Sequence, residues 1–439
     1  MAKKEKRLLL WRILLGVLIV CNMAMIFLFS SQNGAKSAAV SKRVVISFVE
    51  MISKWTESKT TTTEDITTPE ENTTPEENTP PEETKPKDPM EHLTEEQKVM
   101  VNKAHTPIRK LAHMLEFGSL AALALLLLIT WPGKLLWRYA ASLGFTLFYA
   151  ATDELHQLFS QGRGSRLSDV AIDFVGAFVA CTILLAIVAS VRRGKRLVTT
   201  HYDLPLLPNG KSLCIGLVAD LHACPHEDLA ERLRQASPDM ILLVGDIMEN
   251  DELADEWSSG YAFLRSCAAI APTYYTFGNH EMIGASRNGT QCAQGVSDEM
   301  RARIEKTGVT LLHNESVLVD GIRICGLASG LSKKENRPDE AALAEFADAK
   351  EFRILLCHHP EYYEPYIRET NIDLVVSGHA HGGQWRIFGR GVYAPGQGIF
   401  PKYTSGVIDN RLVISRGAGD HTHIPRIANP RELVIIRCK

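Results

Sequence analysis

Five short apolar runs in the C-terminal half of the chain each end on side chains that can bind a metal ion. The runs end on Asp220 and His222, on Asp246, on Asn279 and His280, on His358 and His359, and on His379 and His381. A single ending of this kind is typical of a glycine-rich surface turn. Five of them favour a sheet instead, because open α/β sheets bind ligands at the carboxyl ends of their strands.

The same half of the chain alternates short strands with helices and then continues into hairpins. We expect strands near residues 213–219, 240–245, 273–277, 322–327, 353–357 and 373–377, and helices near 227–236 and 253–268. A hairpin around Asp409–Asn410 and the strand "ELVIIR" follow. This order predicts an α/β fold of two packed mixed β-sheets flanked by helices, which we assign to residues 213–439.

The N-terminal part contains long apolar stretches that are typical of transmembrane helices. We expect spans near residues 8–30, 111–130, 136–152 and 170–191, which form a four-helix transmembrane bundle within residues 1–195. "MAKKEKR" precedes the first span and "VRRGKR" follows the fourth, so the positive-inside rule places both termini in the cytoplasm. The chain is therefore predicted to be an integral plasma-membrane protein.

Two connecting segments complete the predicted organisation. Residues 57–90 repeat "TTPEEN" and are dense in Thr, Pro and Glu, which predicts a disordered external loop. A helix restarts after it, where "TEEQ" forms a capping box between Thr94 and Gln97. Residues 196–212 are interpreted as a linker to the soluble domain.

Charge and cysteine content exclude two classes of protein. The 439 residues carry a formal net charge of −3, so no nucleic-acid partner is expected. The nine cysteines lie singly, without CxxC spacing, which indicates a reducing compartment rather than a disulfide framework.

The predicted spans also carry polar side chains at helical spacing. These are Arg109, His113, Glu116, Asp153, His156, Gln157, Asp169 and Asp173. Ionisable groups at membrane depth are costly unless paired, so the set is a candidate functional site. The alternative is a set of interhelical salt bridges, such as Arg109 with Asp173, and the sequence leaves both open.

The donors at the five strand ends favour divalent metal ions. Two carboxylates, one amide and several imidazoles, without a cysteine, suit manganese, zinc or iron. Two such ions can clamp the attacking and leaving oxygens of a phosphoryl transfer. A carboxylate must then bridge them, and Asp246, alone on its strand end, is the natural candidate.

Both halves resemble known families. "RKLAHMLEFGSL" and "DELHQLFSQGRGSRLSDVAIDFVGA" resemble the VanZ-like membrane family, which implies a four-helix module but no settled reaction. The D-x-H, G-D, G-N-H-E, H-x-P and G-H-x-H blocks, in that order, resemble the calcineurin-like metallophosphoesterases. "GDIME" has Glu249 where an aspartate is commoner, and no effect on the metals is expected from it.

The second resemblance implies a role for each matched residue. The first metal would be bound by Asp220, His222, Asp246 and His381, and the second by Asp246, Asn279, His358 and His379. His280 would contact the phosphate and act as the general acid. His359 competes with His358 for its role, although the H-x-P spacing favours His358. His421 and His423 could line the substrate pocket or be solvated loop residues.

We therefore expect a membrane-anchored binuclear phosphoesterase that hydrolyses a phosphodiester or pyrophosphate, on a membrane lipid or cell-envelope precursor. Two alternatives stay open. One is an anchored protein or nucleotide phosphatase. The other is a membrane binding or sensory protein in which the phosphoesterase domain is accessory.

Overall fold

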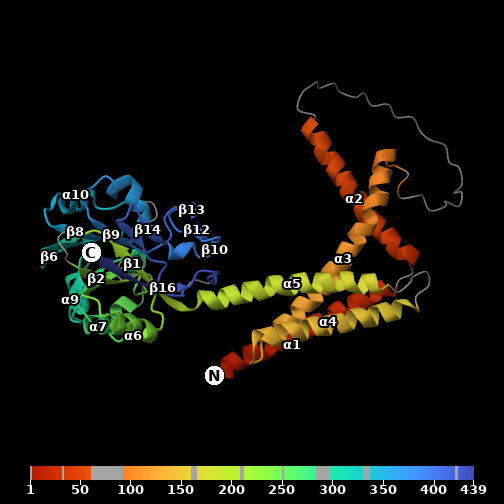
Figure 1. Cartoon of the computed structure of the whole chain (residues 1–439), viewed down its shortest axis with the longest axis horizontal. Helices are drawn as coiled ribbons and strands as arrows, with labels where there is room; N and C mark the ends of the chain where they lie inside the picture. The colour runs from red at the N-terminus through yellow and green to blue at the C-terminus, as the bar shows by residue number, and fades with distance from the viewer. Residues whose placement is uncertain are drawn as a thin grey trace, which may run out of the picture. The chain divides into compact units, whose positions relative to one another are not determined.

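The chain forms two compact units in this computed structural model, Met1–Ala186 and Ile187–Lys439 (Figure 1). The structure describes residues 2–31, 34–60, 90, 92–159, 166–207, 212–249, 252–282, 296–329, 337–420 and 424–439. Most of the predicted external loop, residues 61–89, therefore lies outside the described residues, and residues 57–60 belong to a helix.

Long helices make up the N-terminal unit. They are α1 (Ala2–Ser30), α2 (Gly34–Thr60), α3 (Glu95–Ile129), α4 (Leu135–Gln157) and α5 (Leu167–Gly194), the last of which runs on into the second unit. The capping box at the start of α3 is confirmed. The Thr94 side chain accepts a hydrogen bond from the Gln97 backbone N–H, and the Gln97 side chain accepts one from the Thr94 backbone N–H. Helix α2 was not predicted, since its apolar residues are interrupted by Lys, Ser and Glu.

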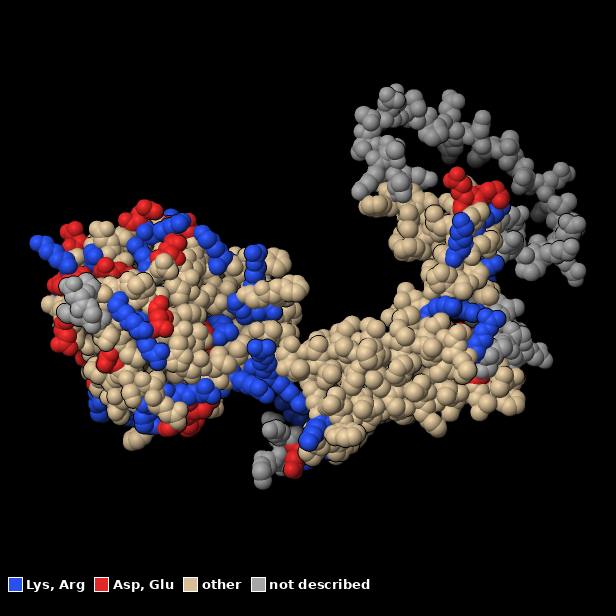
Figure 2. All heavy atoms as spheres, viewed as in Figure 1, with Lys and Arg blue, Asp and Glu red and all other residues tan. Residues whose placement is uncertain are grey.

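Three of these helices are long and apolar enough to cross a membrane. They are Glu5–Ser30, Glu95–Ile129 and Leu167–Gly194, and they indicate a membrane protein. Helix α4, the third of the four predicted spans, is not among them, because Arg138 and the polar run Thr152–Gln157 reduce its hydropathy. Figure 2 shows few charged side chains along the body of this unit, and residues such as Leu10, Phe148 and Ile183 are exposed there.

Small residues let the apolar helices approach closely. A Cβ atom at Gly176 of α5 would lie 2.2 Å from the carbonyl oxygen of Met114 in α3, so only glycine fits. Ala177 is fully buried between α3, α4 and α5, beside Leu125 and Cys181. Gly176 and Ala177 are therefore packing residues of this unit.

Two six-stranded mixed sheets form the C-terminal unit. The first has the order β1-β16-β2-β3-β4-β5, with β1 (Leu197–Leu204), β16 (Arg431–Cys438), β2 (Leu213–Val218), β3 (Met240–Val244), β4 (Thr273–Thr276) and β5 (Thr310–Leu311). The second has the order β14-β15-β9-β8-β7-β6, with β14 (Gly406–Ile408), β15 (Leu412–Ile414), β9 (Leu374–Ser377), β8 (Phe352–Cys357), β7 (Ile322–Leu327) and β6 (Glu315–Val319). Strands β2, β3 and β4 run parallel to one another, as do β7, β8 and β9.

The predicted pair of mixed sheets is therefore present, and its core explains the apolar runs. Leu217 and Leu242 of the first sheet pack in one buried cluster with Leu356 and Val376 of the second. Helices α6 (Glu227–Ala236), α7 (Ser259–Ala268) and α9 (Asp298–Glu305) pack on the outer face of the first sheet. Helix α10 (Glu340–Asp348) contributes Leu343 and Phe346 to a cluster on the outer face of the second.

The predicted linker at residues 196–212 is wrong in its first half. Residues 197–204 form strand β1, which pairs in parallel with β16 along its whole length. Leu197 and Leu204 are buried at its two ends, while exposed polar residues between them hide the strand in the sequence. Only Lys195 and Arg196 separate helix α5 from the first strand of the C-terminal unit.

Candidate metal centre

Parallel strands from both sheets bring the predicted ligands to one place. Asp220 and His222 follow β2, Asp246 follows β3, Asn279 and His280 follow β4, His358 follows β8, and His379 and His381 follow β9. Five of these residues have positive φ: Asp220 (52°), His222 (50°), Asp246 (52°), His379 (65°) and His381 (45°). Such backbone is costly for residues other than glycine and is concentrated at functional sites.

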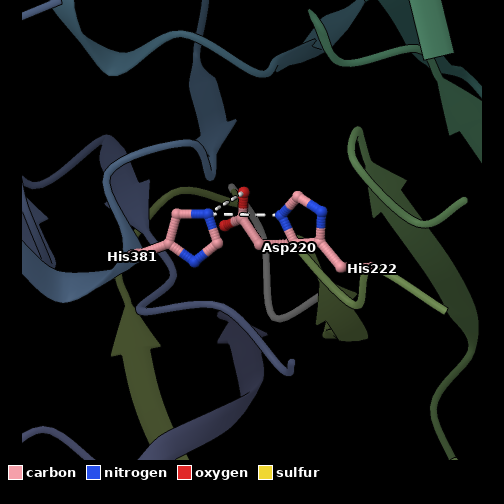
Figure 3. Close-up of side chains that lie close together, drawn as sticks. All are labelled: Asp220, His222 and His381. Atoms are coloured by element: carbon pink, nitrogen blue, oxygen red, sulfur yellow. Dashed lines mark hydrogen bonds and ion pairs between the residues drawn. The ribbon is translucent and has the colours of Figure 1, made fainter. Parts of the chain in front are cut away.

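Asp220, His222 and His381 form the first cluster (Figure 3). The Nε2 atoms of His222 and His381 are 3.2 Å apart, and His381 Nε2 is 3.7 Å from Oδ1 of Asp220. With metal–nitrogen bonds of about 2.1 Å, two ligand nitrogens of one ion lie roughly 3.0–3.4 Å apart. The two imidazoles thus have the separation that a shared ion requires.

Asp246, His358 and His379 form the second cluster. His358 Nε2 lies 3.2 Å from Oδ2 of Asp246, and its Nδ1 is 2.8 Å from the carbonyl oxygen of Val244, which fixes the ring. Oδ2 of Asp246 is also 3.8 Å from His222 Nε2 in the first cluster. Asp246 therefore lies between the two sets of ligands, as a bridging carboxylate must.

Several buried ligand atoms lack a hydrogen bond within the described part of the chain. They are Oδ2 of Asp220, Oδ1 of Asn279 and Nε2 of His358, the last of which lies in an ion pair 3.2 Å from Oδ2 of Asp246. Leaving polar atoms unsatisfied in a protein interior is costly, and such atoms are rare unless an ion or water meets them. Their oxygen and nitrogen chemistry suits Mn²⁺, Zn²⁺ or iron, so the residues present fit divalent metal ions.

Glu249 connects a predicted ligand to the predicted general acid. One of its carboxylate oxygens lies 2.7 Å from His222 Nδ1 and the other 3.1 Å from His280 Nδ1. Burial opposes the charge, but the hydrogen bonds from the two imidazoles outweigh it and lower the pKa of Glu249 to about 2. Burial likewise opposes the charge on His280, yet the hydrogen bond to Glu249 and the charge of Asp246 raise its pKa to about 9.

A second carboxylate, Glu281, holds the Asp246 loop in place. It is fully buried and accepts hydrogen bonds from the backbone N–H groups of residues 246, 247, 248 and 278, at 2.7–3.1 Å. The hydroxyl of Tyr275 donates a fifth, at 2.6 Å. Neither Glu249 nor Glu281 was predicted to act in the site, although Glu249 ends the quoted GDIME stretch and Glu281 ends the G-N-H-E block.

The structure gives His358 and His359 different surroundings. His358 lies next to Asp246, whereas His359 hydrogen-bonds Glu361 at 3.1 Å and stacks on the ring of Tyr362. Burial lowers the pKa of His359 despite that hydrogen bond. This arrangement favours His358 as the ligand.

A segment near the C-terminus contacts His381 through polar side chains. Asn429 Nδ2 donates to the carbonyl oxygen of His381 at 2.7 Å, and Arg426 Nη2 lies 3.4 Å from its Nδ1. The Arg426 side chain is almost fully buried and also donates to the carbonyl oxygen of Arg416. His421 and His423, the predicted pocket residues in the same region, lie outside the described residues.

The polar residues of the predicted spans come together in part. His113 Nδ1 lies 3.8 Å from Glu116 and 3.9 Å from Asp173, which joins α3 to α5. Within α4, Gln157 donates to Asp153 at 2.9 Å, and the ring of His156 packs on Phe27 of α1. Asp169 and Arg109 are only partly buried, and the ion pairs of the described residues do not include one between Arg109 and Asp173.

Comparison with known proteins identifies both units. Residues 15–189 match the VanZ/LLP1 family model, and residues 214–383 match the model for calcineurin-like phosphoesterases. The chain joins a VanZ-like unit to a calcineurin-like metallophosphoesterase. Both resemblances inferred from the sequence are therefore confirmed, and the phosphoesterase family is metal-dependent.

Several bacterial proteins are similar to part of the chain. The uncharacterized protein YpbG of Bacillus subtilis is 25% identical over 260 residues, which cover 57% of this chain and 95% of YpbG. The uncharacterized metallophosphoesterase Cj0846 of Campylobacter jejuni is 28% identical over 53% of this chain and 61% of its own length. Phosphodiesterase YaeI of Escherichia coli is 28% identical over 35% of this chain and 52% of its own length. The chain thus spans less than two thirds of the latter two relatives.

Proposed function

We propose that this protein is a membrane-anchored, binuclear metal-dependent hydrolase of a phosphodiester or pyrophosphate carried by a membrane lipid or cell-envelope precursor. One observation carries the proposal more than any other. The carboxylate of Asp246 lies between the cluster of Asp220, His222 and His381 and the cluster containing His358 and His379. A shared carboxylate between two ligand sets is the arrangement that two-metal phosphoryl transfer requires.

Each proposed ion has four protein ligands. Asp220, His222, Asp246 and His381 would hold the first, and Asp246, Asn279, His358 and His379 the second. When bound, two such ions lower the pKa of water to near neutrality and neutralise charge on the phosphate oxygens. The chain's own contribution is to fix the donors before substrate arrives, through the Val244 carbonyl behind His358 and the Asn429 amide behind His381.

His280 is proposed as the general acid that protonates the leaving oxygen. Its side chain is 36% exposed, whereas those of His222 and His358 are 3% and 0% exposed, so it faces outward where a substrate can reach it. Its backbone N–H donates to Oδ1 of Asp246 at 2.9 Å, which places the ring beside the proposed metals. Glu249 fixes the orientation of that ring and the nitrogen that carries the proton.

The connection to the membrane supports a lipid-borne substrate. Helix α5 ends at Gly194 and strand β1 begins at Leu197, so three peptide units, roughly 11 Å of chain, join an apolar helix to the catalytic sheet. A catalytic unit held so near a bilayer meets lipid-linked phosphates at a high effective concentration. A soluble nucleotide or phosphoprotein gains nothing from this connection.

The proposed topology has four spans, with both termini and the phosphoesterase in the cytoplasm and the Thr/Pro/Glu-rich segment outside. It requires α4 to cross the membrane with the three more apolar helices. Protease added to intact cells should cut within residues 61–89 and leave residues 197–439 intact. Cleavage inside the catalytic unit on intact cells would overturn the proposed four-span topology.

An activity screen of the full-length, detergent-purified protein tests the reaction. The metal-depleted protein should be inactive, and Mn²⁺, Zn²⁺ or Fe²⁺ should restore hydrolysis, with two ions bound per chain. Substrates should include bis(p-nitrophenyl) phosphate, p-nitrophenyl phosphate, a phosphopeptide, a nucleotide and a polyprenyl pyrophosphate in mixed micelles. Preference for the phosphopeptide or nucleotide would support an anchored phosphatase. Absence of turnover with both ions bound would favour a sensory protein.

A further inference from the structure

Two small hairpins follow His381 and carry an exposed apolar surface. The first pairs β10 (Arg386–Ile387) with β11 (Arg390–Gly391), and the second pairs β12 (Tyr393–Ala394) with β13 (Gly398–Ile399). Strands β10, β12 and β13 lie together at one side of the C-terminal unit (Figure 1). We call the large exposed apolar residues here the hairpin surface: Trp385, Ile387, Phe388, Tyr393, Ile399, Phe400 and Ile424.

The exposure of these side chains is not explained by the fold. Phe388 is completely exposed (102%), and Ile399 and Phe400 are 73% and 71% exposed. Phe388 and Phe400 also have positive φ, 49° and 53°, a conformation that is costly for a bulky residue. Strained backbone that presents aromatic rings to solvent stabilises nothing within the unit, and contiguous exposed apolar residues mark interaction sites.

The hairpin surface is built directly onto the metal centre. The N–H of Val392 donates to the carbonyl oxygen of Gly383, two residues after His381. A Cβ atom at Gly383 would lie 2.3 Å from the Cα of Gly391, so the first hairpin packs tightly on the ligand-bearing turn. In the second hairpin, a Cβ atom at Gly396 would lie 2.3 Å from Oε1 of Glu361, the partner of His359.

The same surface adjoins the end of helix α5. The ring nitrogen of Trp385 donates to the carbonyl oxygen of Pro425 at 3.0 Å, and Trp385 forms a β-bridge with Ile427. Arg426 lies between Pro425 and Ile427. Its carbonyl oxygen is so near helix α5 that a Cβ atom added at Gly194 would be 2.3 Å from it. The start of the first hairpin and the last residue of helix α5 thus contact one short segment, residues 425–427.

Basic residues accompany the apolar ones. Arg390 is exposed in the first hairpin, and Arg192, Arg193, Lys195 and Arg196 are exposed around the end of α5. Aromatic and aliphatic side chains beside exposed cations are the composition of a surface that lies at the membrane–water interface, where cations meet lipid phosphates.

We propose that the hairpin surface docks on the lipid bilayer and thereby holds the metal centre at the headgroup layer. Phe388, Ile399 and Phe400 enter the interface, and Arg390 contacts anionic headgroups. A second copy of the chain is the competing occupant. The bilayer is favoured because the surface adjoins the point at which the chain leaves its own membrane helix. This inference extends the proposed function, since docking brings a lipid-linked phosphate to the ligands that the hairpins follow.

Fluorescence quenching tests docking without requiring turnover. Phe388→Cys in the full-length protein is labelled with the fluorophore NBD and reconstituted into phosphatidylethanolamine/phosphatidylglycerol vesicles, with and without doxyl-labelled lipid. Trp257→Cys, at an aromatic residue that is 90% exposed outside the hairpin surface, is the matched control, and the labelled parent chain gives the background. Doxyl lipid should quench the probe at 388 and not at 257. Equal quenching at both positions, or none at 388, would overturn the proposal.

A second set of variants separates docking from the chemistry. Asparagine tolerates positive φ, so Phe388→Asn with Phe400→Asn removes the aromatic rings without straining either turn. The double variant should keep its rate on bis(p-nitrophenyl) phosphate and lose about a hundredfold on a vesicle-embedded pyrophosphate, the scale expected for burying two aromatic rings. Trp257→Asn should change neither rate.

The outcomes of the two experiments are distinguishable. If the parent chain hydrolyses no substrate, the proposed function fails while quenching still decides docking. A dimer is indicated by two results: the probe at 388 is shielded only at high protein concentration, and the double variant abolishes a dimer seen by size-exclusion chromatography. In that case a second copy of the chain covers the hairpin surface, and bilayer docking is refuted.

Discussion

His358 Nε2 lies 3.2 Å from Oδ2 of Asp246, although the two residues come from different sheets. The contact joins the end of β8 to the end of β3 and places a carboxylate from the first sheet among imidazoles from the second. Neither atom makes an apolar contact in the core. We therefore expect the pair to serve ions rather than packing, which makes it the first target for mutation.

Asp246→Asn should remove the shared negative charge and lower kcat/KM by about a thousandfold, the scale of losing one strong electrostatic contact at a reacting centre. The melting temperature should change little. Metal analysis should show fewer than two ions per chain. The control Asp348→Asn, at an exposed residue of α10, should match the parent protein in rate and in metal content. An active Asp246→Asn protein that retains two ions would refute the bridging assignment.

His280→Ala should leave both metals bound and lower kcat by roughly a hundredfold, because a positioned general acid contributes on that order. Metal content and rate should be measured on the same preparation. The loss should shrink for a substrate with a good leaving group, such as p-nitrophenolate, which needs little protonation. An equal loss on good and poor leaving groups would assign His280 to binding.

Glu249→Gln should lower the rate by about tenfold through His222 and His280, as changes in the residues behind metal ligands commonly do. Glutamine can accept from only one of the two rings and turns an amide N–H₂ toward the other. Glu249→Asp keeps the charge and should lose less than Glu249→Gln. The ranking of the two variants in kcat and in metal affinity is the measurement, and the reverse ranking would contradict the role.

Glu281→Gln should destabilise the catalytic unit by about 3 kcal/mol, because a buried acceptor of four backbone N–H groups becomes partly a donor. Chemical denaturation followed by tryptophan fluorescence gives the free energy of unfolding. Glu345→Gln, on the exposed face of α10, is the control. A loss of activity with no loss of stability would mean that Glu281 acts on the chemistry instead.

Gly176→Val should destabilise the VanZ-like unit by about 2 kcal/mol, since overpacking a tight helix contact forces the backbones apart. Its new Cβ would meet the Met114 backbone at 2.2 Å. Gly144→Val in α4 is the matched control, because a Cβ there has nothing within 4 Å. Thermal unfolding in detergent should separate the two variants, and equal melting temperatures would show that α3 and α5 do not pack as described.

The strand ends were predictable because each combines an uninterrupted apolar run with a polar terminus. Ile241–Val244 and Leu374–Val376 are fully buried on both faces, and such runs are visible in a sequence. Strand β1 was missed because His201 and Asp203 are exposed between its buried ends, and an edge strand of mixed composition looks like a linker. Glu249 and Glu281 were underestimated because their roles depend on which atoms the fold brings within 3 Å.

The pairing of β1 with β16 has a consequence for how the protein is made. Leu197 pairs with Arg431 and Leu204 with Cys438, partners separated by 234 residues in the chain. Strand β16 lies between β1 and β2, so the first sheet stays divided until β16 has left the ribosome. The nascent catalytic unit must therefore wait beside the membrane with an open sheet edge while more than half of the chain is translated. Long-range pairing of this kind folds slowly and exposes the intermediate to mispairing. A ribosome that stalls before β16 would leave on the membrane a chain with its second-sheet ligands in place and its first sheet incomplete, a natural substrate for membrane proteases.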